Sequence, residues 1–321
     1  MERILYHPAV SGLLSALMVT AITTGSHLAP LAIVLISLPL YMTGFRNGSR
    51  AALLALLVPV LALGFQAKDP LAALFLIGPY LVLPWLVVKM IRDMGYGIQQ
   101  AMGMGFLFGC FAVVLATASA PSSDTDSLMN RYLETQKTAI LKEAGKQQKG
   151  VQAFTAEQKV QLEETIDQIV LTVRYLFASL LALTWFLIQA INLHLSRVML
   201  TAQGAWHGES EERLRSMRLP LRWVWAILLL VGVSYVGSGT VQQLAVNLLL
   251  FALIPYLFQG WAILDSWFRY KQIKRHIRLL FWAMVVVFWL QQFMLMLVLL
   301  GLFDTWFDFR KKMAGTQNRE G

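Results

Sequence analysis

The sequence predicts an all-α, polytopic transmembrane helix bundle of about nine spans, with a polar helical insert outside the membrane. Hydrophobic residues make up 57% of the chain, charged residues make up only 14%, and the mean hydropathy is +0.59. The apolar residues form long blocks, and blocks of about 18 or more apolar residues are typical of membrane spans. Most basic residues lie in short loops between these blocks, which is the pattern of a helical membrane protein.

The apolar blocks define the expected spans. In chain order they cover roughly residues 8–24, 28–45, 51–66, 70–91, 98–119, 170–196, 221–237, 241–264 and 279–302. The first three are short for a hydrocarbon layer about 30 Å thick, so we expect them to pack among neighbours or to be partly broken. Pro79 and Pro84 lie inside the fourth span, where neighbouring helices can satisfy the carbonyls that the prolines leave unpaired.

The polar segment before the sixth span divides the chain into four regions. These are a five-helix membrane part over 1–119, a polar insert over 120–168, further membrane helices over 169–302, and an interfacial turn with a polar tail over 303–321. Within the insert we expect one helix over about 126–144. Thr155 and Gln158 fit a capping box that starts a second helix, which runs unbroken into the sixth span.

The formal net charge of +9 indicates contact with anionic lipid headgroups rather than with nucleic acid, because the basic residues lie in loops between spans. With the N-terminus in the cytoplasm, the inner loops hold Arg46, Arg50, Lys89, Arg92, Arg197, Arg213, Arg215, Arg218, Arg222, Arg269, Lys271, Lys274, Arg275 and Arg278. Nine crossings would place the tail outside, although it carries Arg310, Lys311 and Lys312. Either the tail is an exception or one late segment does not cross.

No motif for catalysis, a cofactor or a metal is found in the sequence. Cys110 is the only cysteine and lies in an apolar block, which excludes an intramolecular disulfide and a cysteine metal cluster. Intramembrane hydrolysis requires a Ser–His, Asp–Asp or His–Glu–His arrangement within the bilayer, and none is found. We therefore expect a multi-pass protein of a bacterial cytoplasmic membrane that is not an enzyme.

Neutral polar residues in the spans are the candidate ligand-binding residues. Gln189 and Asn192 share a helix face in the sixth span, and Asn247 and Gln259 lie in the eighth. One interpretation is a small-molecule pocket lined by amides. The other is hydrogen bonding between helices, which is the simpler explanation for any one of these residues.

Two pairs of small residues are candidates for close helix packing. Gly12 and Ala16 lie four residues apart in the first span, and Gly105 and Gly109 lie four residues apart in the fifth. Such pairs let helices approach closely. Contact within the fold is the simpler interpretation, and docking of another membrane protein is the alternative.

Two carboxylates follow the last span. The apolar run from Leu279 to Leu302 is long enough to cross the bilayer, so Asp304 and Asp308 are expected to be solvated at the interface. With Arg310 they would anchor and orient the last helix. A catalytic pair would instead need burial.

Three short stretches carry a resemblance to a known family. The C-terminal stretch 301–310, the stretch 191–195 and the Arg218-Leu219-Pro220 sequence before Trp223 resemble the YybS-like family of bacterial membrane proteins, which is named for lack of a known function.

The N-terminal part is also similar to the S components of energy-coupling-factor transporters. The similarity rests on Leu28-Ala29-Pro30, on Pro39 with the stretch 44–48, and on Gly78-Pro79 with Lys89. It implies an S-component-like helical core that binds a small solute and docks on other transporter subunits. This chain departs from S components by three extra spans and the polar insert. The alternative function is a non-transport membrane scaffold or assembly factor that recruits partners through the insert or the basic loops.

The loop charges generate a topology prediction. In a Cys110→Ala background, an impermeant thiol reagent applied to intact cells should label Gly145→Cys but neither Arg215→Cys nor Gln272→Cys, because the two basic loops face the cytoplasm. Labelling at 215 or 272 without labelling at 145 would contradict this orientation.

Overall fold

The computed structural model describes residues 7–67, 69–119, 134–135, 137–138, 156–206, 219–288 and 290–311, and every regular element in these ranges is helical. Six stretches are long and apolar enough to cross a membrane: Ala29–Asn47, Ser49–Gln66, Ala73–Asp93, Ile98–Thr117, Val160–Ala202 and Gly239–Tyr270. Shorter apolar helices cover Pro8–Thr23, Arg222–Val236 and Gln292–Phe307. The predicted helical membrane class is therefore confirmed, and the number of spans agrees roughly.

The helices fall into two compact units. The first contains Met1–Cys110, Leu183–Trp225 and Ala252–Gly321, and the second contains Phe111–Ala182 and Ala226–Phe251. Of the predicted helix over 126–144, only positions 134–135 and 137–138 are described, and they are helical. Thr155, the basic residues of 207–218 and the tail beyond position 311 lie outside the described residues.

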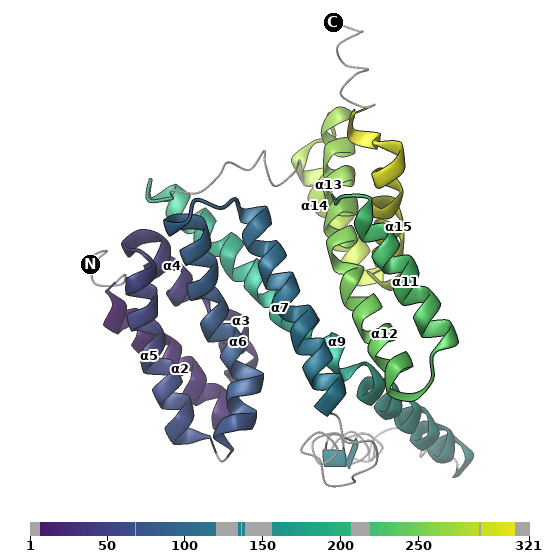
Figure 1. The fold of residues 1–321 in the computed structure, drawn as a ribbon, viewed down its shortest axis with the longest axis horizontal. Coiled ribbons are helices and arrows are strands. Elements are labelled where there is room, and N and C mark those ends of the chain that lie inside the picture. Colours follow the sequence, from purple (N-terminus) through teal and green to yellow (C-terminus); the bar gives the residue numbers. More distant parts are fainter. Residues whose placement is uncertain are drawn as a thin grey trace, which may run out of the picture. The chain divides into compact units, whose positions relative to one another are not determined.

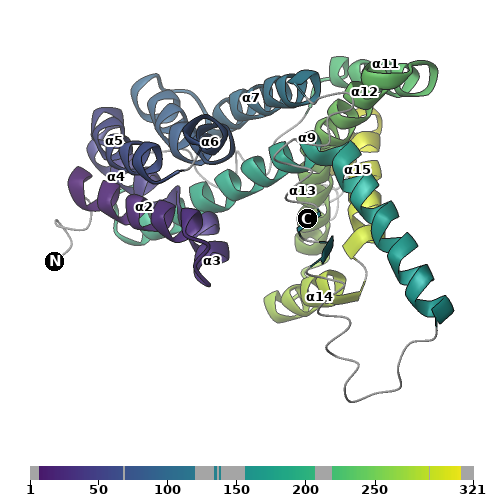
Figure 2. The same ribbon diagram turned by 90° about the horizontal axis from the view of Figure 1, so that it is seen from below.

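The N-terminal helices lie side by side in Figures 1 and 2. They are α2 (Pro8–Thr23), α3 (Ala29–Leu35), α4 (Leu38–Asn47), α5 (Ser49–Gln66) and α6 (Pro70–Val88), which continues into the π-helix η1 (Lys89–Asp93) and is followed by α7 (Ile98–Ser119). The predicted second span is broken between α3 and α4. Pro39 explains the break, because proline lacks an N–H and fits a helix only in its first turn.

The helix α9 (Ala156–Ala202) has 47 residues and is unbroken from Ala156, its first described residue. The prediction that the second helix of the insert continues into the sixth span is therefore confirmed. At 1.5 Å per residue it is about 70 Å long, more than twice the thickness of the hydrocarbon layer. Part of α9 must therefore extend outside the membrane.

The last predicted span, 279–302, is two helices, so the prediction of one continuous helix is wrong. Helices α11 (Arg222–Val236), α12 (Gly239–Ala252) and α13 (Ile254–Tyr270) are followed by α14 (Arg275–Phe288) and α15 (Leu290–Phe307). The ring of Phe293 lies 5.6 Å from that of Phe281 and 5.8 Å from that of Trp282. Residues 11 or 12 positions apart in one helix are separated by about 17 Å, so these ring contacts require the chain to turn.

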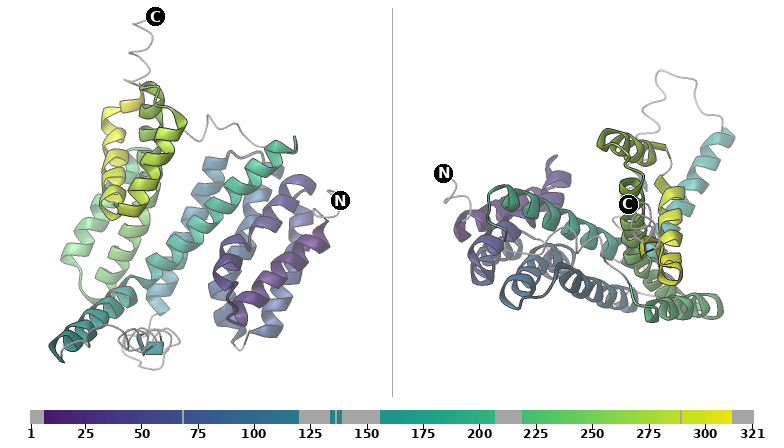
Figure 3. Two further views of the ribbon diagram at one scale, coloured as in Figure 1. Left: turned by 180° about the vertical axis from the view of Figure 1, so that it is seen from behind. Right: turned by 90° about the horizontal axis from the view of Figure 1, so that it is seen from above.

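Glycines bring α13 and α15 into direct backbone contact. The two helices lie side by side in Figure 3, where α15 is yellow and α13 lies beside it in green. A Cβ atom at Gly260 would lie 1.9 Å from the carbonyl oxygen of Leu297, and one at Gly301 would lie 2.1 Å from that of Tyr256. No larger residue fits at either position without separating the helices.

We therefore expect Gly260→Ala to lower the free energy of unfolding by about 1–3 kcal/mol or more, because the added methyl group meets backbone rather than a flexible side chain. Thermal unfolding of the purified protein in detergent measures this loss. The control is Gly232→Ala in α11, where a Cβ atom has no neighbour within 4 Å. Equal unfolding temperatures for the two variants would contradict the close crossing.

Candidate functional site

A side chain of α9 forms a hydrogen bond with a backbone carbonyl at the break between α3 and α4. Asn192 is fully buried, and its Nδ2 donates hydrogen bonds to the carbonyl oxygens of Val34, at 2.6 Å, and Ile188, at 2.8 Å. Ser15 of α2 donates from its hydroxyl to the carbonyl oxygen of Ile36, at 3.0 Å. Carbonyls that the broken helix leaves without partners are therefore paired by side chains from two other helices.

Gln189 lies on the same face of α9 and belongs to a hydrogen-bonded chain that reaches a proline inside the unbroken helix α6. Its Nε2 donates to the hydroxyl oxygen of Ser37, at 3.0 Å, and that hydroxyl donates to the carbonyl oxygen of Tyr80, at 2.5 Å. In an α-helix this carbonyl would accept from the N–H of residue 84, which is a proline and has none. Ser37 thus satisfies the carbonyl that Pro84 leaves unpaired.

The two amides keep buried oxygens without donors. The partners of the amide nitrogens fix their orientation, because a backbone carbonyl can only accept and the Ser37 hydroxyl already donates elsewhere. Within the described part of the chain, the Gln189 Oε1 and the Asn192 Oδ1 have no hydrogen-bond partner. Buried acceptors in proteins are usually paired, so these two atoms, three residues apart on one helix, are candidate ligand-binding groups.

Two of the contributing residues, Ser15 and Ser37, were missed by the sequence reasoning. Ser37 precedes Leu38 and Pro39, which is a helix-start signal inside an apolar block and could have been recognised. Ser15 has no such local signal, because its partner is a carbonyl 21 residues away.

Asn247 belongs to the second unit and has a complete set of partners. Its Oδ1 accepts from the backbone N–H of Ser179, at 2.9 Å, and its Nδ2 donates to the carbonyl oxygen of Tyr175, at 2.8 Å. These two backbone groups are the ones that α9 itself would pair in an ideal helix. Both ends of the amide are engaged, so this arrangement fits interhelical hydrogen bonding and leaves no atom for a ligand.

Gln259 lies in a third polar cluster, between α13 and α15. Its Oε1 accepts from the backbone N–H of Leu219, at 3.1 Å, and its Nε2 donates to a carboxylate oxygen of Asp304, at 3.2 Å. Asp304 also accepts from Arg310, at 2.9 Å, and from the backbone N–H of Phe309, at 2.8 Å. The structure therefore groups Gln259 with the C-terminal residues.

The prediction that both carboxylates are solvated is wrong for Asp304, which is only 4% exposed. Asp304 is buried where α15 crosses α13 closely at Gly301, and there it contacts Gln259 and Arg310. Asp308 is half-buried and has a positive φ of 48°. Phe303 and Trp306 project outward and are about half exposed, at 45% and 51%, as side chains at a membrane interface often are.

The small-residue pairs differ from each other. A Cβ atom at Gly12 would lie 2.6 Å from the carbonyl oxygen of Ala55 in α5, and Ala16 is buried. Among the described residues nothing lies within 4 Å of a Cβ atom at Gly105, so the close contact predicted there is absent. Gly105 is partly exposed on α7, and Gly109 is buried on the same helix.

Comparison with known protein families gives a match over most of the chain. The model of a family described as "Predicted membrane protein (DUF2232)" matches residues 13–305, from α2 to α15. No curated protein and no solved structure matches the chain.

The buried ion pair of Asp304 and Arg310 can be tested. Asp304→Asn keeps one acceptor oxygen, enough for the Phe309 N–H, but its amide nitrogen replaces the oxygen that accepts from Gln259 and Arg310 and carries no charge for the guanidinium. We therefore expect the free energy of unfolding to fall by about 3–5 kcal/mol. Adding Arg310→Gln should restore part of this loss. A double-mutant cycle on thermal unfolding measures the coupling between the two residues, and additive effects of the two changes would exclude it.

Proposed function

Because the chain belongs to the DUF2232 family of predicted membrane proteins, we propose that it binds a small hydrogen-bond-donating solute within the membrane, at the face of α9 that carries Gln189 and Asn192. The observation that carries this proposal is the pair of buried amide oxygens without donors. We further propose that the protein is not an enzyme and that it lies in a bacterial cytoplasmic membrane. It includes an S-component-like core, which the sequence resemblance implies, and hence uptake together with other transporter subunits.

The hydrogen bonds of the two amides restrict the chemistry of the solute. The nitrogens of both amides donate to protein oxygens, so only acceptor atoms remain for a ligand. A buried acceptor without a donor costs about 1–3 kcal/mol, which a bound donor would recover. Hydroxyl, amine and ammonium groups supply such donors, whereas a carboxylate or phosphate oxygen would face two further acceptors.

A non-transport scaffold is the second candidate, and the length of α9 is the observation that favours it. The first turns of α9 carry exposed apolar side chains, with Val160 54% and Ile169 56% exposed. A helix that extends beyond the bilayer with apolar residues exposed could recruit a partner together with the insert over 120–168.

Two asparagines allow a matched test of solute binding. Asn192→Leu and Asn247→Leu each remove a fully buried amide with hydrogen bonds to helices, so both should lower stability by a similar amount, about 1–3 kcal/mol. Only Asn192→Leu removes an oxygen without a donor. We expect a small molecule that co-purifies with the wild-type protein, identified by mass spectrometry, to remain with Asn247→Leu and to be lost from Asn192→Leu.

Equal retention of small molecules by the two variants, at matched amounts of folded protein, would count against the site. Deleting residues 120–168 distinguishes the scaffold function from the solute-binding function. A strain in which Asn192→Leu has no effect but the deletion removes the cellular function would favour the scaffold.

A further inference from the structure

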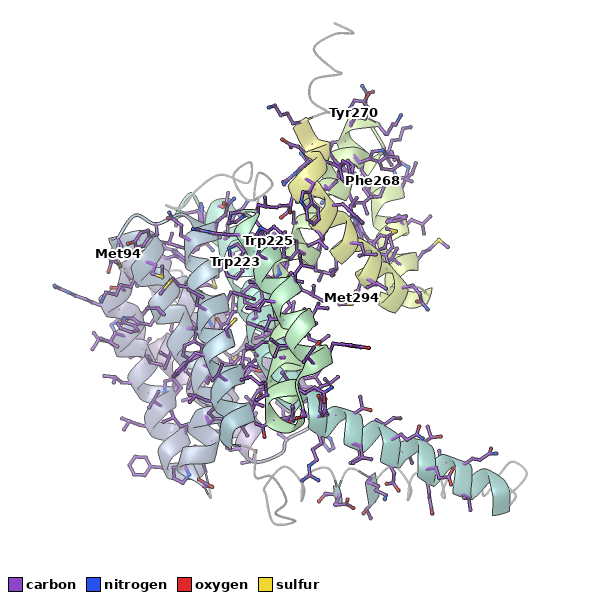
Figure 4. All side chains as sticks on the ribbon, turned by 45° about the vertical axis from the view of Figure 1, so that its right-hand side comes forward. Met94, Trp223, Trp225, Phe268, Tyr270 and Met294 are labelled. Carbon is purple, nitrogen blue, oxygen red and sulfur yellow. The ribbon has the colours of Figure 1, made fainter. Side chains whose placement is uncertain are left out.

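The turn between α13 and α14 has a fixed backbone geometry. Gln272 has a positive φ of 51°, its N–H donates to the carbonyl of Arg269, at 2.8 Å, and the N–H of Ile273 donates to the carbonyl of Phe268, at 2.9 Å. This pair of hydrogen bonds is a Schellman motif, with Ile273 and Phe268 at the positions that usually make its apolar contact. The residues after α13 therefore form a turn of defined geometry. In Figure 4, the labels Phe268 and Tyr270 mark the end of α13.

Five basic residues surround this turn, and they are of two kinds. Arg269 and Arg278 both pair with Asp265, at 3.2 Å and 3.5 Å, and so tie the end of α13 to the start of α14. The other three are exposed, and no acidic side chain in the described part of the chain pairs with them. These three, which we name the turn cations, are Lys271, Lys274 and Arg275.

An apolar surface follows the turn cations directly along α14. Ile277, Leu280 and Met284 are 48%, 63% and 53% exposed and share one face of the helix. The opposite face packs against α13, where the ring centroid of Trp282 lies 5.1 Å from that of Trp261. Exposed positive charge therefore comes first along the chain, and exposed hydrocarbon follows it.

This order matches the order of groups in a phospholipid. We propose that the turn cations bind the phosphate of an anionic phospholipid whose acyl chains lie along Ile277, Leu280 and Met284. Lys and Arg at a membrane surface attract anionic headgroups, and apolar side chains bury acyl methylenes. Inorganic phosphate would satisfy only the cations, so the apolar surface points to the lipid.

The test uses the full-length protein in a neutral detergent, titrated with phosphatidylglycerol and followed by native mass spectrometry. Each basic side chain near an anionic surface contributes about fivefold to binding, so Lys271→Gln/Lys274→Gln/Arg275→Gln should bind phosphatidylglycerol roughly 100-fold more weakly than the wild type. The single variant Lys274→Gln should lose about fivefold, and it keeps the test usable if the triple variant does not fold.

A matched control removes three other exposed cations, with Arg50→Gln/Arg222→Gln/Lys311→Gln. We expect this control to keep the wild-type affinity, phosphatidylcholine to bind weakly to every variant, and inorganic phosphate not to compete with the lipid. An equal loss in the control would show general charge attraction and overturn the proposal. Competition by inorganic phosphate at the lipid's own concentration would overturn it as well.

Discussion

Every backbone N–H and C=O group within the hydrocarbon layer must be paired inside the protein, because no water is there to replace a missing partner. Prolines interrupt the backbone pairing of this protein, both at the break between α3 and α4 and inside the continuous helix α6, so side chains must pair the freed carbonyls. Ser37 pairs the carbonyl that Pro84 leaves free, and Asn192 and Ser15 pair carbonyls at the break before Pro39. The packing of α2, α6 and α9 around this break follows from those hydrogen bonds.

In the side-chain amides of Gln189 and Asn192, the nitrogen and the oxygen differ in whether they have a hydrogen-bond partner. Their nitrogens are used by the fold and their oxygens are not, so structural and ligand-binding roles meet in one pair of residues. Asn247 provides the contrast, because both of its ends are bound to α9. An amide in a membrane helix is therefore informative about function only when its two ends are considered separately.

The sequence predicted the class of the fold because long apolar blocks carry that information locally. It also brought Gln189 and Asn192 together, since their spacing sets one helix face. Contacts between distant residues could not be predicted in this way. Gly260 and Gly301 touch opposite backbones although 41 residues separate them, and Gln259 binds Asp304 across 45 residues. The solvation predicted for Asp304 was wrong because its burial depends on such contacts with α13, which the local apolar pattern does not contain.

The distance along the chain between Val34 and Asn192 has a consequence for how the protein is made. The carbonyl of Val34 is synthesised 158 residues before the amide that pairs with it. The α3–α4 break therefore enters the membrane with backbone groups whose partners do not yet exist. Until α9 arrives, those groups need water or the insertion machinery as a substitute, so the N-terminal helices reach their final packing only late in biosynthesis.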